Sequence, residues 1–292
     1  MNLTGKACIA GVMGWPVAHS RSPACHGYWL AHYGVDGAYV PLPVRPENLE
    51  TALRALPLLG FAGVNVTVPH KEAALAIVDE ADALATRIGA VNTVSVRSDG
   101  GLVGTNTDGF GFLENLHHGA PSWRAAAGPA VVLGAGGAAR AIVAALLDAG
   151  APEIRLVNRT ATRAENLRDA LAGPIRVESW AGRADALAGA SLLVNATTLG
   201  MTGGEGLDLD LGQLPGAALV TDIVYAPLET PLLMAARGLG HPTVDGLGML
   251  LHQARPGWRM WFSGAAPGGD TGPIDPEVTD ALRTAVLLDM AR

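Results

Sequence analysis

Short apolar runs alternate with amphipathic segments along the first hundred residues of the chain. Apolar runs bounded by Gly, Pro or polar residues predict strands, whereas apolar positions three and four residues apart predict helices. The predicted strands are residues 7–12, 38–42, 61–66, 91–96 and 102–104. The predicted helices are residues 22–33, 47–56, 71–78 and 81–88, the first begun by Ser22 with Pro23 at its first position. Residues 98–101, with the sequence Ser-Asp-Gly-Gly, join the last two strands and favour a hairpin.

The alternation becomes regular after residues 121–128, whose Pro, Gly, Ser and other small residues predict a hinge. Further strands are predicted at residues 130–133, 154–157, 191–196, 219–224 and 242–244. Helices are predicted at residues 138–149, 162–171 and 231–237. The tail from residue 248 is also helical in pattern, with a Gly/Pro-rich loop at 263–276. Strands that alternate with helices imply βαβ units on a parallel sheet. The fold class is therefore α/β.

Composition limits the size of the fold and its partners. The 292 residues suffice for two ordinary domains or one large one, and 49% of them are hydrophobic, enough to bury a sizeable core. A net charge of −7 offers no basic surface for nucleic acid or an anionic membrane. Cys8 and Cys25 are too few for a disulfide framework and are expected to be small buried hydrophobes. The eight histidines lack metal-ligand spacing, so no metal site is predicted.

The N-terminus has two possible interpretations. Lys6 followed by the apolar residues 7–18 resembles a short signal peptide. Gly11, Gly14 and Pro16 break that run, and a first strand is the better interpretation. No other apolar run approaches the ~18–20 residues needed to span a bilayer. We therefore expect a soluble, cytoplasmic protein.

Residues 130–140 carry the pattern G-x-G-x-x-A between a predicted strand and a predicted helix. Gly134 permits a tight turn, Gly136 lets the backbone approach a pyrophosphate, and Ala139 allows close packing of helix on strand. The amides of the helix start, at Gly137 and Ala138, would then face the phosphates. A glycine-rich turn without a ligand is common. Because strand, helix and second strand follow in register here, dinucleotide binding is favoured.

The end of the second strand of this unit indicates which dinucleotide is bound. Sites for NAD usually place Asp or Glu there, against the ribose 2′-hydroxyl. This chain has Asn158, Arg159 and Thr160 instead, with Arg163 one helical turn further on. A guanidinium and a hydroxyl suit a 2′-phosphate. The pattern therefore favours NADP, although surface arginines often have no such role.

Two polar motifs in the first hundred and ten residues suggest proton transfer. In residues 63–71, alternation puts Asn65 and Thr67 on one strand face, and the following turn lets Lys71 open a helix. A second strand ends in Asn-Thr followed by Asp108. A carboxylate beside a lysine orients its ammonium group for proton transfer. From the pattern alone, an exposed lysine at a helix start and an ordinary N-cap aspartate are equally good interpretations.

The order of these motifs resembles the shikimate dehydrogenase family through nearly the whole chain. The matching segments are residues 14–23, 65–71, 89–93, 106–109, 158–160, 195–201, 225–233 and 245–253. Gly27, after His26, stands where many members have Asn or Gln. The resemblance implies an N-terminal α/β substrate domain of residues 1–112 with 246–292, and a Rossmann-type NADP-binding domain of residues 113–245 with a parallel sheet. It also implies a cleft between the domains, which would close during hydride transfer.

The resemblance implies a role for each matched residue. Ser20 and Ser22 would hold the substrate carboxylate, while Thr67 and Tyr225 close the pocket around the substrate. Lys71 would be the proton donor, with Asp108 as its orienting partner. Further substrate contacts are expected from Asn92 and Gln253. The residues expected to bind the cofactor are Gly134, Gly136, Gly137, Ala138, Asn158, Arg159, Thr160, Arg163, Thr197, Gly246 and Met249.

The activity implied by the resemblance is the reversible, NADP-dependent reduction of 3-dehydroshikimate to shikimate, on the route through chorismate to the aromatic amino acids. The implied partners are this small-molecule substrate and NADP, in a monomer or homodimer. Two alternatives remain open. Quinate or an amino-shikimate would use the same fold, and a ligand-binding regulator would keep the pockets without catalysis.

Overall fold

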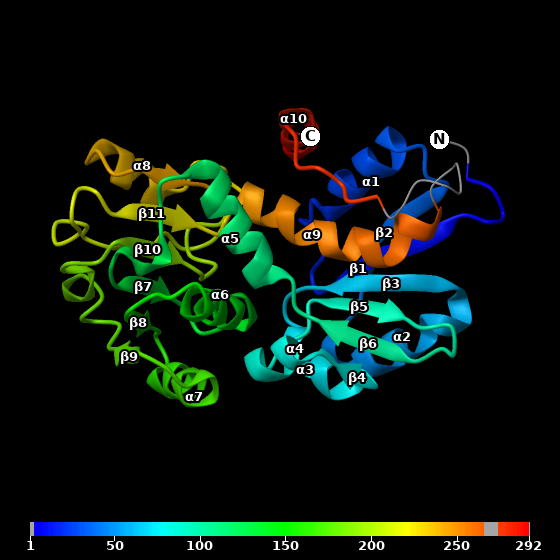
Figure 1. Ribbon diagram of the computed structural model, residues 1–292, viewed down its shortest axis with the longest axis horizontal. Helices are drawn as coiled ribbons and strands as arrows, with labels where there is room; N and C mark the ends of the chain where they lie inside the picture. Colours follow the sequence, from blue (N-terminus) through cyan, green and yellow to red (C-terminus); the bar gives the residue numbers. More distant parts are fainter. Residues whose placement is uncertain (1–2, 266–273, 292) are drawn as a thin grey trace. The chain divides into compact units, whose positions relative to one another are not determined.

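The computed structural model describes residues 3–265 and 274–291, so residues 266–273 of the predicted Gly/Pro-rich loop lie outside the described residues. The chain forms two compact units, residues 1–107 with 250–292 and residues 108–249. Each unit contains its own β-sheet and helices (Figure 1). This confirms the predicted α/β fold with two domains. Among the helices described, none is both long and apolar enough to cross a membrane.

The first unit contains a six-stranded mixed sheet in the order β2-β1-β3-β5-β6-β4. Its strands are β1 (Cys8–Gly14), β2 (Gly37–Pro43), β3 (Phe61–Val66), β4 (Glu80–Ala81), β5 (Thr93–Val96) and β6 (Leu102–Thr105). Strand β1 pairs in parallel with β2 and β3, whereas β5 runs antiparallel to β3 and to β6. The predicted hairpin is confirmed. The C-terminal ends of the parallel strands β1 and β3 therefore lie on the same side of the sheet. The polar motifs of residues 14–23 and 65–71 begin at these ends.

Helices cover this sheet with apolar side chains. They are α1 (Ser22–His32), α2 (Leu49–Ala55), α3 (Lys71–Ile77), α4 (Ala83–Ile88), α10 (Asp280–Met290) and most of α9 (Leu247–Phe262). Leu49 and Leu53 of α2 pack in one buried cluster with Val64 of β3. Trp261 of α9 donates from Nε1 to the carbonyl of Val94 at 3.1 Å. The unit therefore has a large apolar core beneath a short polar edge.

The second unit contains a six-stranded parallel sheet in the order β12-β11-β10-β7-β8-β9. Its strands are β7 (Ala130–Leu133), β8 (Ile154–Val157), β9 (Ile175–Glu178), β10 (Leu192–Asn195), β11 (Leu219–Asp222) and β12 (Thr243–Val244). Its helices include α5 (Asp108–Gly119), α6 (Gly137–Asp148), α7 (Ala161–Leu171) and α8 (Pro231–Gly238). This is the Rossmann order, which reverses between β7 and β10. Open parallel sheets bind ligands outside the carboxyl ends of the strands at that point.

Four local features differ from the predictions. Residue Arg21, not Ser22, is the N-cap of α1, and no side chain caps it. Residues 81–88 begin with the short strand β4 before α4 starts. Strand β9 was not predicted, because four partly exposed residues give too short a pattern. Residues 121–128, expected as a hinge, connect α5 to β7 inside the second unit.

Candidate functional site

The glycine loop of the second unit combines a tight turn with an open backbone. Gly134 follows β7 with φ of +110°, and a Cβ atom there would lie 2.9 Å from the carbonyl oxygen of Ala196. Gly136 is the N-cap of α6, and nothing lies within 4 Å of the position that its Cβ would take. Ala139 is fully buried behind the loop. The loop therefore leaves the amides of a twelve-residue helix accessible to an anionic ligand.

The residues after β8 present an exposed cation beside a loop held by hydrogen bonds. Asn158 donates from Nδ2 to the carbonyl of Thr160 at 2.8 Å, which holds the loop at the start of α7. The backbone amide of Arg163 donates to the same carbonyl at 3.1 Å. The Arg159 side chain is 67% exposed, and its NH1 lies 3.8 Å from Oε2 of Glu205. Arg159 is thus available to a ligand that can compete with Glu205.

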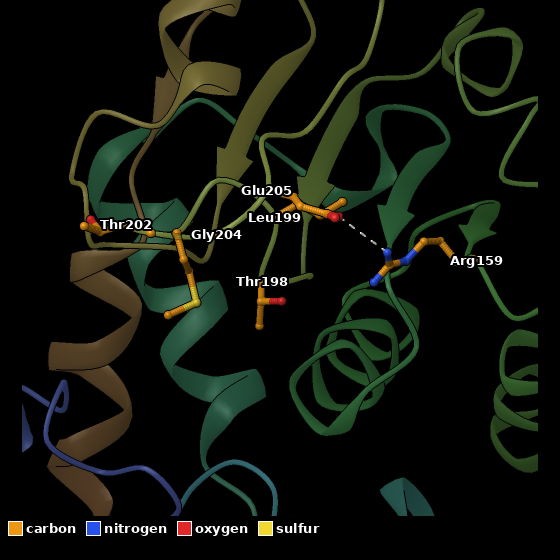
Figure 2. Close-up of a pocket in the computed structure, with 8 residues that line it drawn as sticks. Arg159, Thr198, Leu199, Thr202, Gly204 and Glu205 are labelled. Carbon is orange, nitrogen blue, oxygen red and sulfur yellow. Dashed lines mark ion pairs between the residues drawn. The ribbon is translucent and has the colours of Figure 1, made fainter.

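Arg159 and Glu205 face each other across the rim of a pocket of about 400 Å³ (Figure 2). The other lining residues come from the loop after β10: Thr198, Leu199, Met201, Thr202, Gly203 and Gly204. The backbone amide of Gly200 donates to the carbonyl of Glu205 at 2.7 Å, so this loop folds back on itself. The pocket therefore has one cationic and one anionic side chain at its rim.

A buried carboxylate fixes the strand ends behind that loop. Asp222 accepts hydrogen bonds from Asn195 Nδ2 at 2.9 Å, from the Val224 amide at 3.0 Å and from Thr230 Oγ1 at 2.7 Å. Asn195 Oδ1 in turn accepts from the amide and the hydroxyl of Thr197, at 3.1 and 2.7 Å. Burial raises the pKa of Asp222 to about 6, although its three donors act in the opposite direction. Asp222 therefore determines the orientation of Thr197 through Asn195.

Residues 245–249 include Gly246 and Met249, which were expected to contact the cofactor. Close packing and hydrogen bonds hold this segment in place. A Cβ atom at Gly246 would lie within 2.5 Å of the carbonyl carbon of Ile223. The Leu247 amide donates to Oδ1 of Asp245 at 3.0 Å, and Asn115 Nδ2 donates to the Asp245 carbonyl at 2.7 Å. Met249 is 7% exposed, and Tyr225 is half-buried. Only glycine fits where this segment crosses the residues after β11.

The first unit contains a connected row of buried amide and hydroxyl groups. Tyr39 donates from its hydroxyl to Oδ1 of Asn65 at 2.6 Å, and Asn65 Nδ2 donates to Thr93 Oγ1 at 3.0 Å. Thr93 Oγ1 donates to Asn92 Oδ1 at 2.9 Å. Asn92 Nδ2 then reaches Oε1 of Gln253 at 3.4 Å. The structure thus brings the predicted Asn92 and Gln253 together.

Thr107 completes this row at the sheet edge. Its backbone amide donates to Asn92 Oδ1 at 2.8 Å, and its hydroxyl donates to the carbonyl of Gln253 at 2.9 Å. Asn92 Nδ2 donates to the Thr107 hydroxyl at 3.0 Å. Asp108 follows Thr107 directly and is 4% exposed, but it opens α5 in the second unit.

Thr67 directly follows β3, and Lys71 opens the next helix, α3. The Thr67 amide donates to the carbonyl of Met13 at 2.8 Å, and the Lys71 carbonyl accepts from the Val91 amide at 2.8 Å. Lys71 is the first residue of α3, and its side chain is partly exposed. The main chain therefore holds Lys71 next to the segment that leads into Asn92. Its pairing with Asp108 stays a prediction.

Ser20 and Ser22 lie at the start of α1. The Ser22 amide donates to Ser20 Oγ at 3.3 Å, and Ser22 is 4% exposed in the first turn of the helix. Arg21 between them turns away to pair with Asp289 of α10 at 2.9 Å. The two hydroxyls therefore lie at the positive end of an eleven-residue helix without a basic side chain between them.

Sequence reasoning missed four polar residues of these networks: Tyr39, Thr93, Thr107 and Asp222. Thr93 and Thr107 stand inside motifs that were recognised, directly after Asn92 and directly before Asp108. Tyr39 lies within a predicted strand and carries no local polar signal. Asp222 is an acid at the end of an apolar strand, a position that could have indicated a buried carboxylate.

Comparison with known proteins gives consistent matches over both units. A family model described as shikimate dehydrogenase substrate binding domain matches residues 12–94, and one described as shikimate / quinate 5-dehydrogenase matches residues 122–200. A shikimate dehydrogenase (NADP(+)) of Rhodospirillum rubrum is 63% identical over 289 residues, covering 98% of this chain and 99% of that protein.

Two solved structures show the same fold. Shikimate 5-dehydrogenase of Thermus thermophilus, in complex with NADP(H) and shikimate, is 37% identical with a TM-score of 0.81, covering 96% of this chain and 99% of that one. Quinate dehydrogenase of Corynebacterium glutamicum, in complex with NAD, is 33% identical with a TM-score of 0.85, covering 97% and 99%.

Proposed function

The chain belongs to the shikimate dehydrogenase family, and we propose that this oxidoreductase catalyses the reversible, NADP-dependent reduction of 3-dehydroshikimate to shikimate. The observation that carries the proposal is the row of amides and hydroxyls around Asn92, Thr107 and Gln253. Such groups both donate and accept hydrogen bonds, as the hydroxyls of a cyclitol ring require. A buried polar row of this kind discriminates strongly against analogues that lack the matching hydroxyl.

The serines at the start of α1 suit the carboxylate of the same substrate. Ser20 and Ser22 supply neutral hydroxyl donors, and the N-terminus of α1 favours negative charge. Thr67 at the end of β3 and Tyr225 in the second unit complete the proposed contacts. A ring with a carboxylate on one side and hydroxyls on the other would thus be held at both ends, which orients it for reaction.

Lys71 is the proposed proton donor. NADPH, when bound, supplies the hydride to the carbonyl carbon. Lys71 gives a proton to the carbonyl oxygen, so that the ketone becomes a hydroxyl group, and Asp108 orients the ammonium group. In the opposite direction the same lysine accepts the proton. Lys71 and Lys6 are the only two lysines in the sequence, and the other permanently charged basic side chains are arginines. A lysine can exchange its proton, whereas a guanidinium stays protonated in proteins.

The second unit fits a dinucleotide phosphate. The open backbone at Gly136 and the start of α6, at Gly137 and Ala138, suit the pyrophosphate. The side chains proposed to hold the adenosine end are Asn158, Arg159, Thr160 and Arg163. Thr197, Gly246 and Met249 are proposed on the nicotinamide side. Arg159 carries the preference for NADP, because no acid stands at the end of β8.

Replacing Arg159 with alanine is expected to raise KM for NADPH by about 10- to 100-fold and to change KM for NADH little. The reason is the loss of a charge-assisted contact with the 2′-phosphate, which NADH lacks. Steady-state kinetics with each cofactor measures this. Arg168→Ala, at an exposed arginine near the end of α7 that pairs with Asp169, is the control. Equal effects on both cofactors would mean that Arg159 does not contact the 2′-phosphate.

Glu205 should weaken that preference, because its carboxylate lies 3.8 Å from the guanidinium that the phosphate needs. Glu205→Gln is expected to lower KM for NADPH by about two- to fivefold, a size typical of an exposed ion pair. KM for NADH should not change, and the gain should shrink at high salt. Glu229→Gln, at another exposed ion pair of the unit, is the matched control. A higher KM for NADPH in Glu205→Gln would contradict this role.

Quinate is the second candidate substrate, because the quinate dehydrogenase of Corynebacterium glutamicum has the same fold. The test of the proposed function is a panel of kcat/KM values for shikimate and quinate with NADP⁺ and NAD⁺. Shikimate with NADP⁺ is expected to give the highest value. A preference for quinate with NAD⁺ would overturn the proposal. Binding of NADPH and shikimate without any absorbance change at 340 nm would instead indicate a regulator. Cytoplasmic location and a monomeric or homodimeric state stay predictions.

A further inference from the structure

Arg21 lies between the two serines that we propose for the substrate carboxylate. It is the only Asp, Glu, Lys or Arg residue between Lys6 and Asp36. It is also the N-cap residue of α1, so its backbone leads directly from Ser20 to Ser22. Opposite charges near a protein surface attract each other over about one Debye length, ~8–10 Å at moderate salt. The net charge at the serine end of the site therefore depends on the state of Arg21.

The C-terminal helix offsets the charge of Arg21. Nη1 of Arg21 donates to Oδ2 of Asp289 at 2.9 Å and to the backbone carbonyl of Asp289 at 3.2 Å. This carbonyl belongs to the last turn of α10, which is the negative end of the helix. The side chains of Arg21 and Asp289 are 27% and 36% exposed, so solvent screens their interaction only in part. The guanidinium is thus balanced by a carboxylate and by a helix C-terminus.

This pairing leaves neutral donors for the proposed carboxylate of the substrate. The donors are the hydroxyls of Ser20 and Ser22 and the amides at the start of α1, whose first turn carries no acidic residue. Hydrogen bonds from neutral donors to a carboxylate are weaker than those from a guanidinium. The ion pair between Arg21 and Asp289 therefore limits how much the negative charge of the substrate contributes to binding.

We infer that Asp289 is a specificity-determining residue of the substrate site, which acts through charge by cancelling the one permanent charge beside the two serines. The inference rests on the proposed function. If charge is what matters, removing Asp289 and removing Arg21 must change the affinity for an anionic substrate in opposite directions. If the ion pair only supports the fold, both changes break the same contact and must act in the same direction.

The test measures KM and the dissociation constant for shikimate with the full-length protein, at low and at high salt. Asp289→Asn leaves Arg21 uncompensated and is expected to tighten shikimate binding by about two- to fivefold, the size expected of one partly exposed charge. Arg21→Gln leaves Asp289 uncompensated and should weaken binding by a similar factor. Both shifts should shrink at high salt, because ions screen exposed charges. KM for NADP⁺ should stay close to that of the wild type.

A double variant separates charge from structure. Arg21→Gln with Asp289→Asn restores neutrality and should bind shikimate like the wild type, although the ion pair is gone. Asp99→Asn is the matched control, since it removes an exposed partner of Arg97 at 3.1 Å. Because β5 runs antiparallel to β3, the turn with Asp99 lies at the opposite end of the strands from the serine motif. This control should leave shikimate binding unchanged.

Opposite shifts that cancel in the double variant are the expected result. Shifts in the same direction, no shift in either single variant, or a double variant that binds worse than both would overturn the inference. A loss of about a hundredfold or more in Arg21→Gln would place the guanidinium on the carboxylate itself and would overturn it as well. Absence of shikimate binding by the wild-type protein would overturn the proposed function and the inference with it.

Discussion

Replacing Lys71 with alanine is expected to lower kcat for shikimate oxidation by about 10²–10⁴-fold, the usual contribution of a general acid or base. Shikimate should still bind, because the amide and serine contacts do not depend on the lysine. The loss should therefore appear in kcat more than in KM, as expected for an interaction that matters mainly in the transition state. Stopped-flow or steady-state measurement of NADPH absorbance at 340 nm tests this.

Lys71→Arg distinguishes proton transfer from charge. Arginine keeps the positive charge at the start of α3 but does not release its proton in a protein. We therefore expect Lys71→Arg to lose nearly as much kcat as Lys71→Ala. Recovery of most of the activity by arginine would show that the site needs only a cation, and the proton would then have to come from elsewhere.

Lys6 offers a matched control within the same chain. It is exposed near the N-terminus, and Lys6→Ala should leave kcat and KM unchanged. With just these two lysines in the chain, selective ¹⁵N labelling gives a spectrum in which one ammonium group can respond to shikimate. An unchanged kcat in Lys71→Ala would remove this residue from the mechanism.

Sequence patterns predicted what depends on contiguous residues. Strand β3 and strands β7 and β8 begin and end where their apolar runs do. The turn at Gly134 was also predicted, because a strand, a turn and a helix within a dozen residues leave few alternatives. The order of the strands within each sheet was not predicted, since it depends on which strands pair across long connections.

The polar networks depend on such long connections. Asn92 and Gln253 are 161 positions apart, and Tyr39 and Asn65 are 26 positions apart. Motifs identified one member of each pair or both, but no local pattern tells which side chain accepts and which donates. That information comes from burial, because a buried amide must satisfy its oxygen and its nitrogen with different partners.

The partners of Asp222 were likewise not predicted from the sequence. This residue carries the second prediction of a large effect. It is 1% exposed and holds three donors at the ends of β10 and β11 and the start of α8. Asp222→Ala leaves these donors without an acceptor, at a cost of about 1–3 kcal/mol each where they stay buried. We expect the second unit to lose about 3 kcal/mol of stability or more. Because Thr197 depends on Asn195, KM for NADP⁺ should also rise.

The pH dependence of stability follows from the raised pKa. Burial brings the pKa of Asp222 from 3.8 to about 6 in the folded protein. Between these values the folded protein holds a proton that the unfolded chain has lost, so the contribution of Asp222 is fully present below pH 3.8 and is lost as the pH rises through 6. The complete change is about 3 kcal/mol, of which about 2 kcal/mol falls between pH 4.5 and 7.5.

The measurement compares wild type with Asp222→Asn, which has no titrating group at this position. The free energy of unfolding from urea denaturation, wild type minus variant, should fall by about 2 kcal/mol from pH 4.5 to 7.5 and then stay level. Hydrogen exchange in β10 and β11 assigns the change to the second unit. Asp208→Asn, at a fully exposed carboxylate 3.7 Å from Arg183, should show no such slope. A difference that rises with pH would mean that its three donors outweigh burial and that Asp222 is stabilised as a carboxylate.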